Sequence, residues 1–322
     1  MPATSAERRP FRFGVGSLLS ATTRQEQVDH VQRAEDAGYD FATFSDHFFV
    51  PFSPMVAMAL AAEVTTRLRL LPFMLANDLR NPAVLAKDVA TLDVVSGGRV
   101  ELGIGAGWSA ADFTAAGLPF LPAGERIARL EQAIEVLRGA WRGEPFDHDG
   151  PAYPVRGLVG TPAPVQPGGP PLMVGGGGRK ILTLAARVAD IVTINPQPIG
   201  VAPTGDATPA ERLAERVAWI DAATEGRATQ PERHILIGSV AVTDDRRAGA
   251  ERAIEFIASR PGVAVLPEPD ELLASPFAAI GSVAHLCAQL EELRATTGIS
   301  SFSVPADALT EFAPVVAALA GR

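Results

Sequence analysis

Short apolar runs alternate with amphipathic segments along almost the whole chain, and this rhythm limits the possible folds more than any single motif does. The runs expected to be strands are residues 11–16, 40–44, 68–75, 99–104, 172–174, 190–194, 234–242 and 301–304. The segments between them carry apolar residues at spacings of three and four, which is the pattern of a helix with one buried face. Short strands that are apolar on both faces are typical of a parallel sheet covered by helices.

Eight such repeats in 322 residues fit one α/β domain, a (β/α)8 TIM barrel, better than two doubly wound domains. We expect this single domain to span residues 10–322, after a disordered tail at residues 1–9. Two stretches rich in proline and glycine, residues 143–171 and 195–207, break the rhythm and are interpreted as loop insertions. In a barrel the chemistry lies at the carboxyl ends of the strands, so we looked for it in the loops that follow them.

Composition excludes several classes of function. The net charge of −9 argues against a nucleic-acid or anionic-membrane partner. The single cysteine, Cys287, rules out intrachain disulfides and cysteine-cluster metal sites, and the five histidines show no paired-ligand spacing, so no metal is expected. We found neither a signal peptide nor the ~20 apolar residues of a membrane span. We therefore expect a soluble, cytoplasmic protein with neither a nucleic-acid nor a membrane partner.

An acid–histidine pair, Asp46 and His47, ends the second expected strand and is followed by an apolar loop. A histidine at a strand end can donate or accept a proton near neutral pH. The alternative is structural: a histidine hydrogen-bonded into its loop, with Asp46 capping the next segment. Position alone leaves both interpretations open.

Two glycine-rich stretches differ in what they predict. The run from Gly103 to Gly107 has the spacing G-x-G-x-G and follows the fourth strand, so it is a poor dinucleotide fingerprint; close backbone packing at the rim explains it as well. The four glycines Gly175, Gly176, Gly177 and Gly178 join a strand directly to a helix, where backbone N–H groups can converge on a phosphate. Arg179 adds positive charge, and a flexible turn is the less favoured alternative.

Two further features allow a binding role or a structural one. The strand ending in Phe73, Met74 and Leu75 meets polar residues abruptly at Asn77. A bulge there would press backbone against a flat cofactor ring, although an ordinary strand end is commoner. Trp108 could line a pocket or pack under a loop at the rim.

Four segments in this order resemble the luciferase-like monooxygenase superfamily, and especially its branch of oxidoreductases that use the deazaflavin coenzyme F420. They are residues 44–48 (FSDHF), 80–86 (RNPAVLA), 98–108 (GRVELGIGAGW) and 171–178 (PLMVGGGG). Any one of them is weak evidence, whereas four at the family's spacing are specific. The resemblance covers nearly the whole chain and implies the bacterial luciferase-like version of the barrel.

The resemblance also implies roles for individual residues. Asp46 and His47 are implied to face the deazaflavin ring as catalytic residues, with His47 handling the proton. A non-prolyl cis peptide is implied near Phe73 and Met74. The residues implied to bind the cofactor are Phe73, Met74, Leu75, Asn77, Ala106 and Gly107, together with Gly175, Gly176, Gly177, Gly178 and Arg179, which are implied to lie at its phosphate.

This chain departs from the family's sugar-phosphate dehydrogenases, which carry a threonine and an acidic glutamate where Ala106 and Trp108 stand. That difference argues against sugar-phosphate oxidation and predicts an apolar substrate pocket lined by Phe48, Phe49, Phe52 and Trp108. The resemblance therefore implies an F420-dependent oxidoreductase that moves a hydride between deazaflavin and an activated C=C or C=N bond. The alternatives are an FMN-dependent monooxygenase and a non-catalytic F420-binding protein. Relatives are often dimers, so a homodimer is also expected.

Overall fold

The computed structural model describes residues 9–195, 207–259, 263 and 265–322. The expected tail lies outside them except for its last residue, and so does most of the insertion expected at residues 195–207. The chain forms two compact units, which are described separately. The central unit comprises Ser17–Glu35 and Phe41–Val174, and the C-terminal unit comprises Met1–Gly16, Asp36–Asp40 and Gly175–Arg322.

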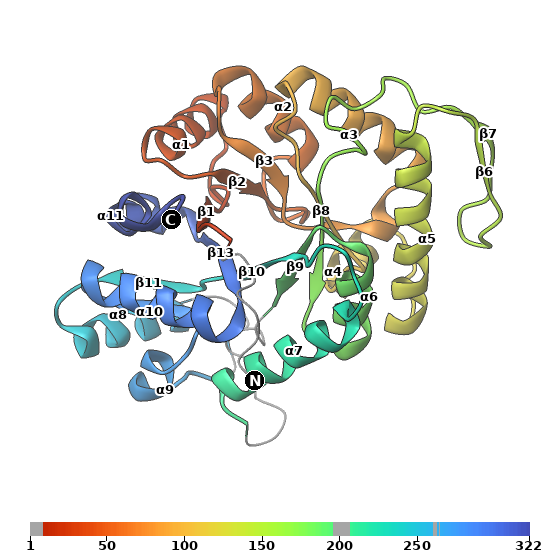
Figure 1. The fold of residues 1–322 in the computed structure, drawn as a ribbon. Helices are drawn as coiled ribbons and strands as arrows, with labels where there is room; N and C mark the ends of the chain where they lie inside the picture. The colour runs from red at the N-terminus through yellow and green to blue at the C-terminus, as the bar shows by residue number, and fades with distance from the viewer. Residues whose placement is uncertain (1–8, 196–206, 260–262, 264) are drawn as a thin grey trace. The chain divides into compact units, whose positions relative to one another are not determined.

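The central unit alternates parallel strands with helices (Figure 1). Its elements are α1 (Arg24–Asp36), β2 (Phe41–Phe44), α2 (Pro54–Val64), β3 (Arg69–Pro72), β4 (Leu75–Ala76), the 3-10 turn η1 (Asn77–Leu79), α3 (Pro82–Ser96), β5 (Leu102–Gly105), α4 (Ala110–Ala115), α5 (Ala123–Trp141), β6 (Phe146–His148), β7 (Val155–Leu158) and the start of β8 (Leu172–Gly176). Strand β2 pairs with β3, and β5 pairs with both β4 and β8, all in parallel. The expected insertion at residues 143–171 holds the antiparallel hairpin β6–β7, which contacts α5.

The C-terminal unit has the same layout. Its elements are β1 (Arg12–Val15), α6 (Arg179–Val188), β9 (Ile191–Ile194), α7 (Pro209–Thr224), β10 (Glu232–Leu236), β11 (Ser239–Val242), α8 (Arg246–Ala258), α9 (Pro269–Leu273), β12 (Ala278–Gly281), α10 (Val283–Thr297), β13 (Ile299–Val304), the 3-10 turn η2 (Ala306–Ala308) and α11 (Leu309–Leu319). Strand β13 pairs in parallel with β1 and β10, and β10 pairs with β9. All eight expected strand–helix repeats are therefore present.

Two expected strands are shorter than their apolar runs. The run at residues 68–75 is divided into β3 and β4 by a cis peptide bond between Phe73 and Met74. The run at residues 234–242 is divided into β10 and β11, and β11 pairs with β12 in a separate two-stranded sheet. Hydrophobicity continues across both divisions, so it cannot show where the hydrogen-bonding partner changes.

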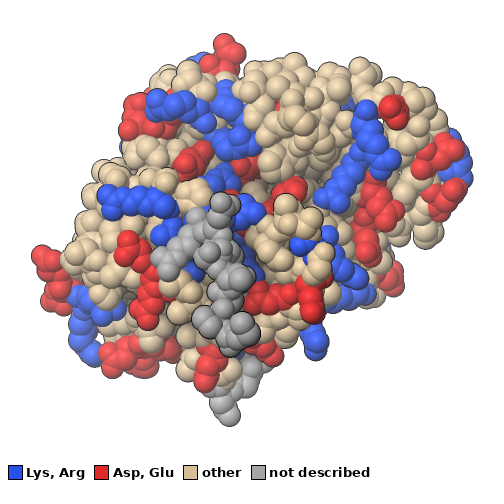
Figure 2. Space-filling view, in the orientation of Figure 1, with Lys and Arg blue, Asp and Glu red and all other residues tan. Residues whose placement is uncertain are grey.

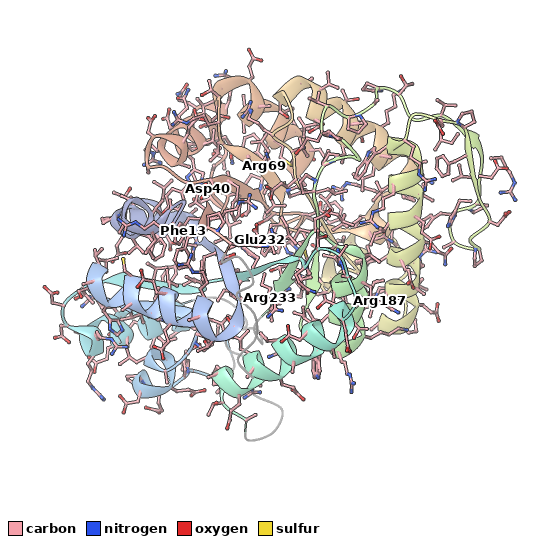
Figure 3. The ribbon with its side chains drawn as sticks, in the orientation of Figure 1. Phe13, Asp40, Arg69, Arg187, Glu232 and Arg233 are labelled. Carbon is pink, nitrogen blue, oxygen red and sulfur yellow. The ribbon has the colours of Figure 1, made fainter. Side chains whose placement is uncertain are left out.

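Aromatic packing and helix caps explain why these segments hold together locally. In the C-terminal unit the buried rings of Phe11, Phe13 and Phe302 lie about 6 Å apart, and such pairs add stability beyond the area they bury. The amide of Phe13 donates to Asp40 Oδ2 at 2.7 Å, and both residues are labelled in Figure 3. In the central unit, the Asn81 side chain caps α3 ahead of Pro82, as the sequence predicts.

Candidate functional site

Asp46 follows β2 and is held by two ionic hydrogen bonds. Nη1 and Nη2 of Arg80 donate to its two carboxylate oxygens at 2.6 and 2.7 Å, and the Ala76 amide donates to Oδ2 at 2.9 Å. Paired donation of this kind is among the stronger hydrogen-bonding arrangements in proteins. Asp46 therefore joins the end of β2 to the end of β4, and both of its oxygens already have partners.

His47 is paired with a different carboxylate. Its Nδ1 lies 2.6 Å from Asp112 Oδ2, and the Phe48 amide donates to Asp112 Oδ1 at 3.3 Å. Burial by itself would raise the pKa of Asp112, but the hydrogen bonds from His47, Ser109 and the Phe48 amide, with the charge of His47, lower it below 3.8. Asp112 is therefore ionised at neutral pH, and no described residue hydrogen-bonds to Nε2 of His47.

Aromatic rings surround the histidine. Phe49 stacks on the His47 ring with centroids 4.8 Å apart and planes 13° apart, and Trp108 meets its edge at 5.3 Å and 73°. Phe48, Phe49 and Trp108 are 64%, 68% and 71% exposed, whereas Phe52 is half-buried. Large exposed aromatic groups gathered around one titratable side chain are typical of a surface that a ligand covers.

The cis peptide bond that the family resemblance implies is present between Phe73 and Met74, so that prediction is confirmed. Phe73 and Met74 are half-buried, but the Leu75 side chain is fully buried and can offer a ligand only its backbone. The glycines of β5 allow this segment to lie close. A Cβ on Gly103 would stand 2.1 Å from the Pro72 carbonyl oxygen, and one on Gly105 would meet the Met74 side chain at 3.0 Å.

The next strand end carries a buried polar cluster. Asn77 Nδ2 donates to Tyr153 Oη and to Asp78 Oδ1, both at 2.9 Å. Asp78 Oδ1 also accepts from Tyr153 Oη at 3.0 Å and from Arg129 Nε at 2.8 Å. Burial, together with the Asp78 carboxylate, raises the pKa of Tyr153 to about 12. Tyr153 lies between β6 and β7, so the insertion at residues 143–171 is anchored to the residues that follow the cis peptide.

Ala106 and Gly107 form a half-buried turn, and both of their carbonyl oxygens accept hydrogen bonds from Arg126. Arg126 Nη1 donates to the Ala106 oxygen at 2.9 Å and also to the Gly107 oxygen. Gly107 has a φ of +77°, and a Cβ there would also meet the Phe113 ring at 3.0 Å, so glycine is required. The structure confirms close packing as one reason for the glycines of this run.

The four-glycine segment lies in the C-terminal unit, at the junction of β8 and α6. A Cβ on Gly175 would stand 2.0 Å from the Thr193 carbonyl oxygen, whereas Gly178 has no described atom within 4 Å of that position. Gly178 is the N-cap of α6 and leaves the first amides of the helix without a side-chain cap. Arg216 Nε donates to the Gly177 oxygen at 3.0 Å, and Arg179 is exposed. Open space, uncapped amides and cations are what a phosphate requires.

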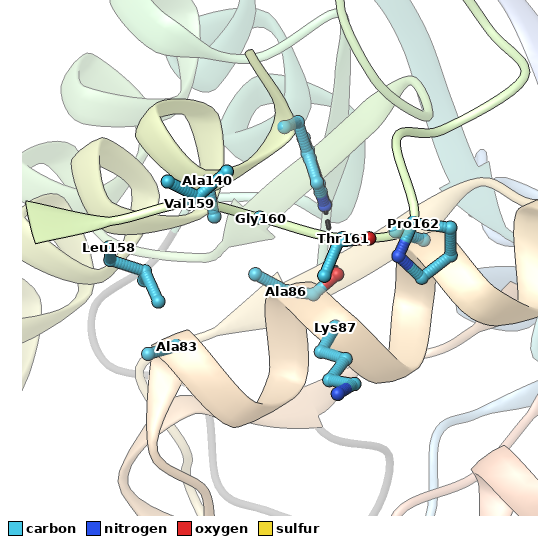
Figure 4. A pocket seen from close by; sticks show the side chains of 11 residues that line it. Ala83, Ala86, Lys87, Ala140, Leu158, Val159, Gly160, Thr161 and Pro162 are labelled. Carbon is cyan, nitrogen blue, oxygen red and sulfur yellow. Dashed lines mark hydrogen bonds between the residues drawn. The ribbon is translucent and has the colours of Figure 1, made fainter. Parts of the chain in front are cut away.

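A cavity of about 130 Å³ lies elsewhere in the central unit (Figure 4). It is enclosed by α3, by the end of α5 and by the segment Leu158–Pro162, and its lining residues are Ala83, Ala86, Lys87, Ala90, Ala140, Trp141, Leu158, Val159, Gly160, Thr161 and Pro162. The Trp141 indole N–H donates to the Ala86 oxygen at 3.1 Å. None of the predicted site residues lines it, so we do not assign the chemistry to this cavity.

Figure 2 shows acidic and basic side chains interspersed on the face in view. Among the described residues, no group of three or more His, Cys, Asp or Glu side chains could hold a metal ion. No helix in that part of the chain is long and apolar enough to cross a membrane.

Sequence reasoning selected His47, the cis peptide segment and both glycine runs as candidates, but it did not select the residues that contact them. These are Arg80, Asp112, Arg126, Tyr153 and Arg216. Asp112 left one local signal, since it stands three residues after Ser109, whose hydroxyl caps α4. The other four contacts join residues between 19 and 76 positions apart, and nothing in the local pattern marks them.

Comparison with known proteins agrees with the fold and the motifs. An F420-dependent glucose-6-phosphate dehydrogenase of Kribbella flavida is 32% identical over 189 residues, 56% of each chain, so the chain spans about half the length of the curated relatives it matches. The coenzyme F420 dependent tetrahydromethanopterin reductase of Methanopyrus kandleri has a TM-score of 0.77 at 21% identity, covering 97% of this chain and 98% of that one.

The monooxygenase RslO1 of Streptomyces bottropensis has a TM-score of 0.75 at 21% identity, with 95% and 99% coverage. These likenesses confirm the expected (β/α)8 fold. The profile described as "Luciferase-like monooxygenase" matches residues 10–301. Because this match covers most of the sequence, the chain belongs to the luciferase-like monooxygenase family.

Proposed function

We propose that this protein is an F420-dependent oxidoreductase that reduces an activated C=C or C=N bond in an apolar small molecule. The observation that carries the proposal is His47, which Asp112 holds by a hydrogen bond among exposed aromatic rings. The similarity to F420-dependent relatives, such as the Kribbella flavida dehydrogenase, supports coenzyme F420 as the cofactor.

Each unit, taken by itself, carries groups that suit one part of a deazaflavin with a phosphate-bearing tail. The uncapped start of α6 offers backbone amides, the space beside Gly178 is open, and Arg179 and Arg216 supply positive charge. In this proposal the deazaflavin ring lies against the half-buried segment at Phe73 and Met74, and Asn77 follows that segment. When bound, reduced deazaflavin supplies a hydride.

The surroundings of His47 favour an apolar substrate. The family resemblance places Trp108 where sugar-phosphate dehydrogenases carry a glutamate, and in the structure the Trp108 indole contacts the His47 ring. Phe48 and Phe49 add exposed apolar surface beside it. Covering these rings with a ligand would also exclude water from His47. His47 gives the proton that completes the reduction, and Asp46 keeps the strand ends in place.

Titration of the purified protein with F420, FMN and FAD, followed by cofactor fluorescence, tests the proposal. We expect F420 to bind at micromolar or lower concentration and FMN to bind far more weakly. Tight FMN binding with no F420 binding would reject the proposal. It would favour an FMN-dependent monooxygenase, because the family is described as one of monooxygenases.

The His47→Ala variant separates an enzyme from a carrier. We expect it to bind F420 as the wild type does but to lose turnover of a panel of activated enones and imines. Unchanged turnover would remove His47 from the mechanism. A wild type that binds F420 but turns over none of the panel would favour the non-catalytic F420-binding protein.

A further inference from the structure

The contact between His47 and Asp112 determines more than the position of the ring. Nδ1 and Oδ2 are 2.6 Å apart, which is short even for a hydrogen bond to a charged group. An ionised carboxylate has no proton to donate, so the hydrogen in this bond belongs to Nδ1. The other nitrogen, Nε2, has no hydrogen-bond partner among the described residues.

We propose that Asp112 is a positioning residue that keeps a proton on Nδ1 of His47 and so makes Nε2 the atom that exchanges protons with the substrate. The proposal deepens the proposed function and rests on it for the reaction. The protonation state of His47 is a property of the protein without ligand, and it can be measured by itself.

Three contacts restrict the His47 ring to one orientation. Asp112 holds Nδ1, Phe49 stacks on one face, and Trp108 contacts the ring at a steep angle. Asp112 is itself held, because the Phe48 amide donates to its second oxygen. A 180° flip of the imidazole would bring a carbon atom against the carboxylate and lose the hydrogen bond. The ring therefore presents Nε2 on the side away from Asp112.

This arrangement determines the path of the proton in the proposed reaction. A bound reduced deazaflavin would supply the hydride, with both electrons, to one atom of the substrate double bond, and the His47 imidazolium gives its Nε2 proton to the other atom. The carboxylate of Asp112 stabilises the imidazolium before the transfer and binds the Nδ1–H of the neutral ring after it. A proton from water then restores Nε2, and substrate oxidation runs through the same steps in reverse.

Long-range 1H–15N NMR correlation on protein labelled with 15N-histidine, without cofactor, tests the assignment. The His47 signals are identified by their loss in His47→Gln, and pH is raised until the ring is neutral. We expect the wild type to carry its proton on Nδ1, and Asp112→Ala to shift the neutral ring largely to the Nε2–H form. A wild-type ring protonated on Nε2, or an unchanged tautomer in Asp112→Ala, would overturn the proposal.

A second histidine–carboxylate pair provides the matched control. His148 Nε2 lies 3.0 Å from the exposed Glu135 carboxylate. Glu135→Gln should leave the His47 signals and the turnover unchanged. If Asp112→Ala does not fold, Asp112→Asn tests the same point, because its amide can present either N–H or oxygen to Nδ1. We then expect a mixture of the two tautomers, and a single Nδ1–H form would count against the role of the charge.

Turnover provides the second readout. Asp112→Asn should lower kcat by about 10²-fold, the lower end of what a positioned proton donor contributes, with cofactor affinity within about twofold of wild type. Normal kcat in this variant would overturn the role of Asp112. Failure of F420 to bind the wild type would instead reject the proposed function and leave the tautomer result intact.

Discussion

Arg80 donates a hydrogen bond from Nη1 and another from Nη2 to the two carboxylate oxygens of Asp46, at 2.6 and 2.7 Å. The same carboxylate accepts a hydrogen bond from the Ala76 amide at 2.9 Å. One side chain at the end of β2 therefore fixes the backbone just beyond the cis peptide. Both carboxylate oxygens of Asp46, the residue before His47, already accept hydrogen bonds, and this favours a positioning role for Asp46. The proton chemistry is left to His47.

Asp46→Asn should destabilise the protein by roughly 1–3 kcal/mol, because a buried charged contact is lost while Arg80 remains. F420 affinity should fall with it, since the segment at Phe73 and Met74 loses its anchor. Urea unfolding and fluorescence titration measure the two effects. The exposed pair Arg156–Asp149 is the control, and Asp149→Asn should change stability by ~0–1 kcal/mol. Equal effects of the two substitutions would contradict the anchoring role.

Tyr153→Phe should weaken cofactor binding although Tyr153 lies in the insertion. Its hydroxyl donates to Asp78 and accepts from Asn77, so removal leaves two buried polar groups short of a partner, at a cost of about 1–3 kcal/mol. Tyr39→Phe is the matched control, because it removes a buried hydroxyl that donates only to the Leu309 oxygen. The control should lose stability without losing F420 affinity. If both variants bind F420 normally, the insertion has no part in holding the site.

The glycines at α6 should separate into packing and binding positions. Gly175→Ala places a Cβ 2.0 Å from a backbone oxygen and should strongly lower the melting temperature. Gly177→Leu meets no atom closer than 3.5 Å at its Cβ and should fold, but its side chain would occupy the space assigned to phosphate. We expect at least a tenfold loss of F420 affinity in a correctly folded Gly177→Leu protein. Normal affinity would refute the phosphate assignment.

His234 should make stability depend on pH. Burial, aided by the charge of Arg12, lowers the pKa of His234 from 6.5 to about 3, and its ring is held by Thr193 and Ser303. Between these two values the unfolded chain binds one more proton than the native protein. The unfolding free energy should therefore fall by roughly 1.4 kcal/mol for each pH unit below about 6.5.

Urea unfolding of wild type and His234→Gln across this pH range isolates the contribution of the histidine, because the other titrating groups are shared. The difference between the two proteins should be constant above about pH 7, where the histidine is neutral in both states. A constant difference from pH 7 down to pH 4 would show that His234 is not buried as a neutral ring.

The sequence by itself determined the succession of strands and helices, because each depends on the spacing of apolar residues and on local caps such as Asn81–Pro82. It also located the glycine runs and, through the family resemblance, the cis peptide. It could not show where an apolar run changes partner, as between β10 and β11. Hydrophobicity reports burial and carries no information about which strand supplies the hydrogen bonds.

Only the tertiary structure decided which carboxylate forms the hydrogen bond with His47. Asp46 is its neighbour in sequence but binds Arg80, whereas Asp112 is 65 residues away and binds Nδ1 at 2.6 Å. Successive residues beyond a strand end can point in different directions, so adjacency in sequence does not ensure contact. Loops that follow different strands can converge in space, and such contacts depend on the whole chain being folded.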